Sequence, residues 1–151
     1  MTHGIDTDFL VAVEIRDHVF HREADALLSA LIAERHELAL APQTLAEFIH
    51  VATDGHRLKQ PLNLREAIER AEFWWNAEEV VRVFPDGQAT QDFFAWLREH
   101  RLGRKRLLDT LLATTYAVNG IRKIVTNNEA DYRVFGCFEC VSFRPGTRTA
   151  S

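Results

Sequence analysis

The sequence has little cysteine, no long apolar run and no excess of positive charge. Its two cysteines, Cys137 and Cys140, are too few for a closed four-ligand zinc site, so we expect two reduced thiols. No apolar run approaches the roughly 18–20 residues that span a bilayer. The first residues also lack the basic segment and apolar stretch of a signal peptide. These absences predict a cytoplasmic protein that does not enter a membrane.

The composition is that of a folded domain. Of the 151 residues, 46% are hydrophobic and 26% are charged, which is ordinary for a globular protein. We expect one domain over residues 1–143, followed by a flexible tail over residues 144–151. The net charge is −4, so a nucleic-acid ligand would have to be held by a local basic patch. His18 and His21 are close in sequence, but no third ligand accompanies them, and we expect both on the solvated surface.

Short apolar strands alternate with helical segments along the chain. Strands are expected near residues 4–6, 37–40, 80–84, 121–125 and 139–143. Helical segments are expected at residues 12–15, 24–33, 42–51, 64–75, 88–100 and 107–118, with one turn near residue 131. Pro42 suits the first turn of its helix and Asn63 can cap the next. This alternation predicts a three-layer α/β/α fold around a central, mainly parallel sheet of four to five strands.

Four acidic residues lie in apolar stretches, where a lone carboxylate is costly and usually has a partner or a metal. They are Asp6, Glu47, Asp109 and Asp131. The predicted elements place Asp6, Asp109 and Asp131 toward one edge of the sheet, where ligands of such sheets bind. Oxygen ligands without a cysteine or histidine cluster favour one or two hard ions such as Mg²⁺ or Mn²⁺. The matching chemistry is metal-dependent phosphodiester hydrolysis.

The neighbours of these acids leave some assignments open. Asp6 follows a strand and can be oriented by Thr7, whereas Asp8 is expected only to cap the next helix. Glu129 is an alternative to Asp131 as the fourth acid. Polar residues that can support the site follow the fourth strand: Thr126, Asn127 and Asn128.

Basic residues crowd the segment before Asp109. Arg101, Arg104, Lys105 and Arg106 in that segment, and Arg57 after the Glu47 helix, are candidates for RNA binding through phosphates. A solvated helix end explains the cluster before Asp109 equally well.

The four acidic segments together resemble the PIN-domain family, especially the VapC-like toxins of toxin–antitoxin pairs. The segments that carry the resemblance are Asp6-Thr7-Asp8-Phe9-Leu10, Pro42 through Phe48, Asp109 through Asn119-Gly120, and Val125 through Tyr132. The resemblance covers Ile5 to about Phe143 and favours Asp131 over Glu129. Asp8 stands where the family usually has Asn, and Tyr132 where it usually has Phe. All four acids of the pattern are present, which implies an active enzyme.

The resemblance implies a Mg²⁺- or Mn²⁺-dependent ribonuclease, a cognate antitoxin that covers the site, and a homodimer. The consecutive Phe73, Trp74 and Trp75 cannot share one helical stripe, so they predict either a partner surface or a two-sided core helix. Two other functions remain open. One is a phosphatase of the haloacid-dehalogenase type that uses Asp6 and Asp8. The other is a non-catalytic PIN-like module that binds RNA or protein.

Overall fold

The computed structural model describes residues 1–146. Within that range five strands form one sheet in the order β3-β2-β1-β4-β5, and every neighbouring pair is parallel. The strands are β1 (Thr2–Ile5), β2 (Glu37–Leu40), β3 (Val80–Arg82), β4 (Lys123–Val125) and β5 (Glu139–Val141). The order changes direction at β1, which lies in the centre of the sheet between β2 and β4.

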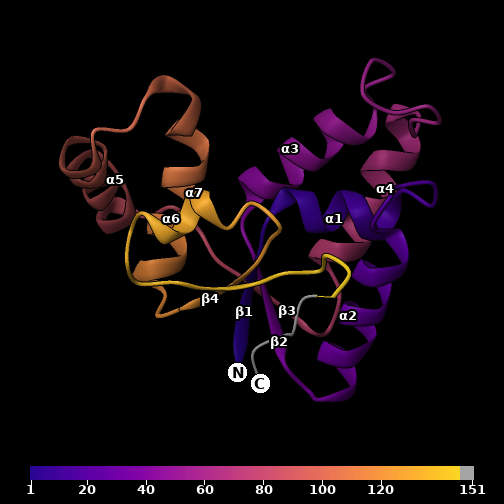
Figure 1. Ribbon diagram of the computed structural model, residues 1–151, viewed down its shortest axis with the longest axis horizontal. Coiled ribbons are helices and arrows are strands. Elements are labelled where there is room, and N and C mark those ends of the chain that lie inside the picture. The colour runs from indigo at the N-terminus through magenta and orange to yellow at the C-terminus, as the bar shows by residue number, and fades with distance from the viewer. Residues whose placement is uncertain (147–151) are drawn as a thin grey trace.

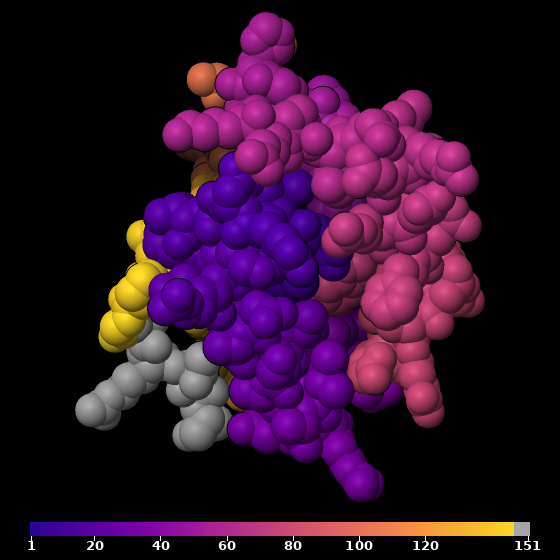
Figure 2. All heavy atoms as spheres, turned by 90° about the vertical axis from the view of Figure 1, so that its right-hand side faces the viewer, coloured from indigo at the N-terminus to yellow at the C-terminus, as the bar shows by residue number. Residues whose placement is uncertain are grey.

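Helices cover both faces of the sheet and complete three layers (Figure 1). One face carries α1 (Thr7–Glu14), α2 (His21–Ala33), α3 (Pro42–Ala52) and α4 (Leu64–Trp75). On the other side lie α5 (Gly87–His100), a 3₁₀ turn (Arg104–Arg106), α6 (Leu107–Val118) and α7 (Ala130–Arg133). The predicted three-layer α/β/α fold is confirmed, with five strands. Figure 2 shows the first of these faces, where the α1–α2 segment packs beside the α3–α4 region.

The core is divided by the sheet because successive side chains of a strand point to opposite faces. In β2, Leu38 and Leu40 join the core beneath α1–α4, whereas Ala39 joins the core beneath α6. Both faces of the strand are thus buried, which explains its continuous apolar sequence.

Close packing of β1 on α6 depends on a glycine. A Cβ atom added to Gly4 would lie 2.7 Å from Cε2 of Tyr116 on α6. The Tyr116 hydroxyl donates to the carbonyl of Ile5 at 2.5 Å and accepts from its N–H at 3.1 Å. The carbonyl of Ala39 in β2 is also within 3.2 Å. Tyr116 therefore fixes α6 against the ends of β1 and β2.

The first helix differs from the sequence prediction. A helical turn was expected only from Ala12, but α1 begins at Thr7. Asp6 has an extended backbone, and its side chain accepts a hydrogen bond from the Thr7 N–H. This N-cap lets the helix start directly after the strand, and it places Asp6 at the junction of the two elements.

The remaining sequence expectations concern the termini and the thiols. Arg144, at the start of the predicted tail, donates to the Asn127 carbonyl at 3.1 Å, and residues 147–151 of that tail lie outside the described residues. Cys137 and Cys140 are free thiols, and burial raises the pKa of Cys140 to about 11. No helix within residues 1–146 is long and apolar enough to cross a membrane.

Candidate active site

A cavity of about 320 Å³ lies where β1 and β4 end, and we call it the acid cavity. Its lining comprises Asp6, Thr7, Asp8, Val11, His18, Glu47, Val51, Arg57, Asp109, Asn128 and Asp131. The structure therefore brings all four predicted acids to one cavity, from the β1–α1 junction and from α3, α6 and α7. This position, beside the strand at which the sheet order reverses, is where ligands bind in open parallel sheets.

Asp6 is the most enclosed of the four acids, with 6% of its surface exposed. One carboxylate oxygen accepts from the Thr7 N–H at 2.9 Å and the other from the Thr126 hydroxyl at 2.8 Å. Thr7 thus orients Asp6 through its backbone, while its own buried hydroxyl has no partner among the described residues. Burial raises the pKa of Asp6 above its ordinary value, because a carboxylate out of water favours the neutral form.

Asp8 is not the helix cap that the sequence predicted, since Asp6 caps α1. Its Oδ2 atom instead accepts from the Asn127 N–H at 2.8 Å, and the Thr126 hydroxyl lies at 3.3 Å. Asp8 therefore fixes the loop after β4 to the first turn of α1. Its other oxygen, Oδ1, is buried without a hydrogen-bond partner in residues 1–146. Burial and the neighbouring Asp6 both raise the pKa of Asp8.

Asp109 lies in the first turn of α6, where the helix dipole favours an anion. Burial, followed by the nearby carboxylates of Asp6, Asp131 and Glu47, raises its pKa to about 7. Glu47 lies half-buried on α3 and faces the same cavity. The pKa of Asp109 is raised although Arg106 beside it acts in the opposite direction, so burial and the neighbouring carboxylates outweigh this one cation.

Arg106 lies between Asp109 and Asp131. Its guanidinium is 3.9 Å from the Asp109 carboxylate and 3.5 Å from that of Asp131, and it donates to the Asp131 carbonyl at 2.5 Å. The sequence grouped Arg106 with the phosphate-binding candidates, but here it pairs with the acids. Glu129, the alternative fourth acid, pairs with Arg133 and does not line the cavity.

The three supporting residues after β4 act in different ways. The Thr126 hydroxyl donates to Asp6, and the Asn128 amide lies 3.4 Å from Asp8. The Asn127 side chain turns away from the acids, because its carbonyl oxygen accepts from Ser142 and from the Phe143 N–H. Asn127 thus ties the loop to the residues after β5, and only its backbone N–H serves the site.

Tyr132 is fully buried beside the acids. Its hydroxyl has no hydrogen-bond partner within residues 1–146. Burial and then the charge of Asp6 raise the pKa of Tyr132 well above its ordinary value, so the phenol stays neutral. The neutral phenol is a potential hydrogen-bond donor to the neighbouring Asp6.

His18 was predicted to lie on the solvated surface, and this prediction was wrong. The structure places this residue half-buried in the lining of the acid cavity. No local signal could have revealed this, because the cavity wall is formed by α1 and α3, which come together only in the fold. Of the basic candidates, Arg57 lines the cavity. Arg101, Arg104 and Lys105 are exposed beyond its lining.

The donor set fits a hard divalent ion, because the converging side chains offer carboxylate oxygens and no thiolate. In residues 1–146, no three Asp, Glu, His or Cys side chains are already grouped as closely as metal ligands. The carboxylates would therefore have to draw together around an ion, and Arg106 competes with a cation for two of them.

Comparison with known proteins assigns the family. The PIN domain family model matches residues 5–135, so this chain belongs to the PIN domain family. No curated protein matches the sequence.

Solved structures with the same fold are distant in sequence. A chain of VapBC-1 from nontypeable Haemophilus influenzae is 17% identical with a TM-score of 0.62, and the match covers 95% of this chain and 98% of that one. Mycobacterium tuberculosis VapC20, described as a sarcin-ricin loop cleaving toxin, is 16% identical with a TM-score of 0.61 over 82% and 87% of the two chains. A chain of VapBC2 from Rickettsia felis, bound to a promoter DNA fragment, is 16% identical with a TM-score of 0.65 over 94% and 98%.

Proposed function

We propose that this PIN-domain protein is a metal-dependent endoribonuclease, the toxin of a VapBC-type toxin–antitoxin pair. The observation that carries the proposal is the meeting of Asp6, Glu47, Asp109 and Asp131 in one cavity. They come from four separate segments, and only the fold unites them. Membership of the PIN family and the likeness to VapC structures support this function over a phosphatase or a non-catalytic module.

The proposed cofactor is Mg²⁺ or Mn²⁺, held by the same four carboxylates. A divalent ion bound there would activate water and offset the negative charge of the phosphate. The raised pKa of Asp109 supports such a role, because a cation would relieve the cost of ionising this group.

The chain itself would orient the reacting groups. Two hydrogen bonds fix the Asp6 carboxylate, from the Thr7 N–H and the Thr126 hydroxyl, so it cannot turn away from the cavity. Asp8 holds the loop that carries Thr126, and Arg106 holds the start of α7 through the Asp131 carbonyl. Asp6 is thus oriented before a metal binds, whereas the other carboxylates would have to move toward the ion.

The proposed partners are RNA, a cognate antitoxin and a second copy of the chain, in the cytoplasm. Arg57, Arg101, Arg104 and Lys105 are exposed and available to phosphates, which compensates for the overall negative charge. Phe73 on α4 is 76% exposed, whereas Trp74 beside it is 6% exposed and belongs to the core. Phe73 is therefore the member of the aromatic triplet available to a protein partner.

The deciding experiment compares wild-type protein with Asp6→Asn on a structured RNA pool, with Mg²⁺, Mn²⁺ or EDTA. We expect metal-dependent cleavage that falls by at least about 100-fold in Asp6→Asn, because a charged ligand is lost. Asp25→Asn, at an exposed position on α2, is the matched control and should retain activity. Hydrolysis of p-nitrophenyl phosphate without RNA cleavage would support the phosphatase instead. Metal binding without either activity would support the non-catalytic module.

A further inference from the structure

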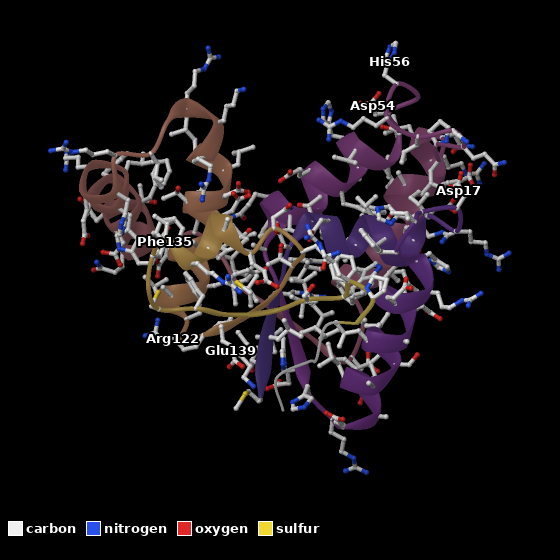
Figure 3. All side chains as sticks on the ribbon, viewed as in Figure 1. Asp17, Asp54, His56, Arg122, Phe135 and Glu139 are labelled. Atoms are coloured by element: carbon white, nitrogen blue, oxygen red, sulfur yellow. The ribbon has the colours of Figure 1, made fainter. Side chains whose placement is uncertain are left out.

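The acid cavity extends well beyond the carboxylates. Its wall includes Val11 on α1 and Val51 on α3, and then His18 and Arg57, which follow those two helices in the chain. Both helices run from the sheet edge toward the same side of the molecule (Figure 1). Figure 3 shows that side, where Asp17 and Asp54, close neighbours of His18 and Arg57 in the chain, are labelled. The lining thus combines the acids with two apolar side chains, Val11 and Val51, and with two nitrogen donors, His18 and Arg57.

The hydrogen bonding of His18 defines what it offers to a ligand. Its Nδ1 atom accepts from the Phe20 N–H at 3.0 Å, so Nδ1 carries no proton and the neutral ring is protonated at Nε2. Burial lowers the pKa of His18, which favours that neutral form. No residue within 1–146 forms a hydrogen bond with Nε2 in the structure. His18 therefore provides a fixed N–H donor without a partner in the described part of the chain.

Arg57 offers complementary donors. Its side chain is 62% exposed, and Nε lies 3.4 Å from the Asp54 carboxylate. Arg57 forms no hydrogen bond or ion pair with any other residue of 1–146. A guanidinium presents its donors in a planar fork that matches phosphate oxygens. The contact with Asp54 restricts the Arg57 side chain, while most of the side-chain surface stays exposed to solvent.

We propose that His18 and Arg57 form a phosphate-binding subsite for RNA, at a nucleotide away from the cleaved bond. This inference rests on the proposed function, because it assumes that the scissile phosphate lies beside the four acids. Val11 and Val51, which line the same cavity, would contact an intervening sugar or base.

The test measures RNA binding in an Asp6→Asn background, which cannot cleave the probe. The probe is a fluorescein-labelled single-stranded RNA, and the readouts are Kd and its dependence on salt. Arg57→Gln should weaken binding by about 3–10-fold and reduce the salt slope by about one, as expected for one lost phosphate contact. His56→Asn, in the exposed loop beside Arg57, is the matched control and should bind as the parent does.

Two substitutions of His18 separate its binding role from its structural role. Asn keeps an acceptor near Nδ1 for the Phe20 N–H but removes Nε2, so His18→Asn should weaken binding by about fivefold. Gln places an N–H near the Nε2 position, and His18→Gln should restore most of the affinity. Thermal unfolding of both variants checks that the fold is intact.

The outcomes distinguish this inference from the function on which it rests. If wild-type protein cleaves RNA but His18→Asn and Arg57→Gln bind the probe as tightly as the parent, the subsite is refuted and the nuclease stands. If wild-type protein does not cleave RNA and the Asp6→Asn parent does not bind it, both proposals fail. Weakening in both variants, with rescue by Gln at position 18, establishes the subsite.

Discussion

Among single residues, Arg106 is the one whose contacts a metal ion would change most. It pairs with Asp109 and Asp131 and is anchored to the Asp131 carbonyl. In the absence of metal it offsets part of the repulsion between carboxylates. A divalent ion would compete for the same oxygens, so the protein contains its own cationic competitor for two of the four proposed ligands.

Replacing Arg106 by Gln should therefore have opposite effects on two measurable quantities. Without metal, the free energy of unfolding should fall by about 1–2 kcal/mol, because a partly buried charged hydrogen bond and two ion pairs are lost. The affinity for Mn²⁺, measured by calorimetry, should rise by about 3–10-fold because the competitor is gone.

Arg104→Gln removes the same charge from an exposed position two residues away and is the control. It should change neither the free energy of unfolding nor the affinity for Mn²⁺ appreciably. Weaker Mn²⁺ binding in Arg106→Gln would contradict competition, and would show instead that Arg106 positions the ligands.

Among the elements, the contact between β1 and α6 sets the distance between Asp6 and Asp109. Gly4 allows this approach because the Tyr116 ring occupies the space of a Cβ atom. Gly4→Ala should lower the free energy of unfolding by about 1–3 kcal/mol, the usual cost of overpacking, as measured by urea denaturation. RNA cleavage should fall as well, since β1 and α6 must move apart.

Gly103→Ala is the matched control for this prediction, because a Cβ atom there meets nothing within 4 Å. It should leave both stability and cleavage unchanged. A Gly4→Ala protein as stable and active as wild type would mean that the Tyr116 ring moves aside without cost.

The elements themselves were largely predictable, because their signals are local. The β2 strand and the α6 helix have the predicted bounds, and α4 begins after Asn63 with a full capping box. The start of α1 was placed too late, because a carboxylate singled out for metal binding also serves as its cap.

The contacts around the acids were less predictable, because they join distant segments. Asp8 binds the Asn127 N–H across 119 residues, and no feature of its own neighbourhood indicates that partner. His18 reaches the cavity only because α1 packs on α3. The convergence of Asp6, Asp109 and Asp131 followed the rule for parallel sheets, and the structure adds Glu47 to the same cavity. The role of the four acids as metal ligands stays a prediction.

For the whole molecule, the acid cavity links stability to pH and metal. Asp6, Asp8 and Asp109 have raised pKa values, so the folded state binds protons more tightly than the unfolded state does. The contribution of Asp109 to stability is therefore complete below about pH 4 and is lost as pH rises through about 7, its pKa in the folded protein.

In EDTA, the melting temperature should accordingly fall between about pH 5 and about pH 8. Saturating Mn²⁺ should reverse this trend, because metal binds the ionised carboxylates. Asp109→Asn should flatten the profile in EDTA, since one of the three titrating groups is gone. An EDTA profile of Asp109→Asn identical to that of wild type would show that Asp109 does not titrate in this range.

The central position of β1 also affects how the protein is made. Asp6 forms its hydrogen bond with Thr126, 120 residues later, directly after β4, and β4 can pair with β1 only once most of the chain has been synthesised. A ribosome would release the helices on one face of the sheet well before this pairing is possible. The nascent chain would thus expose the α1–α4 surface while the acid cavity is still incomplete.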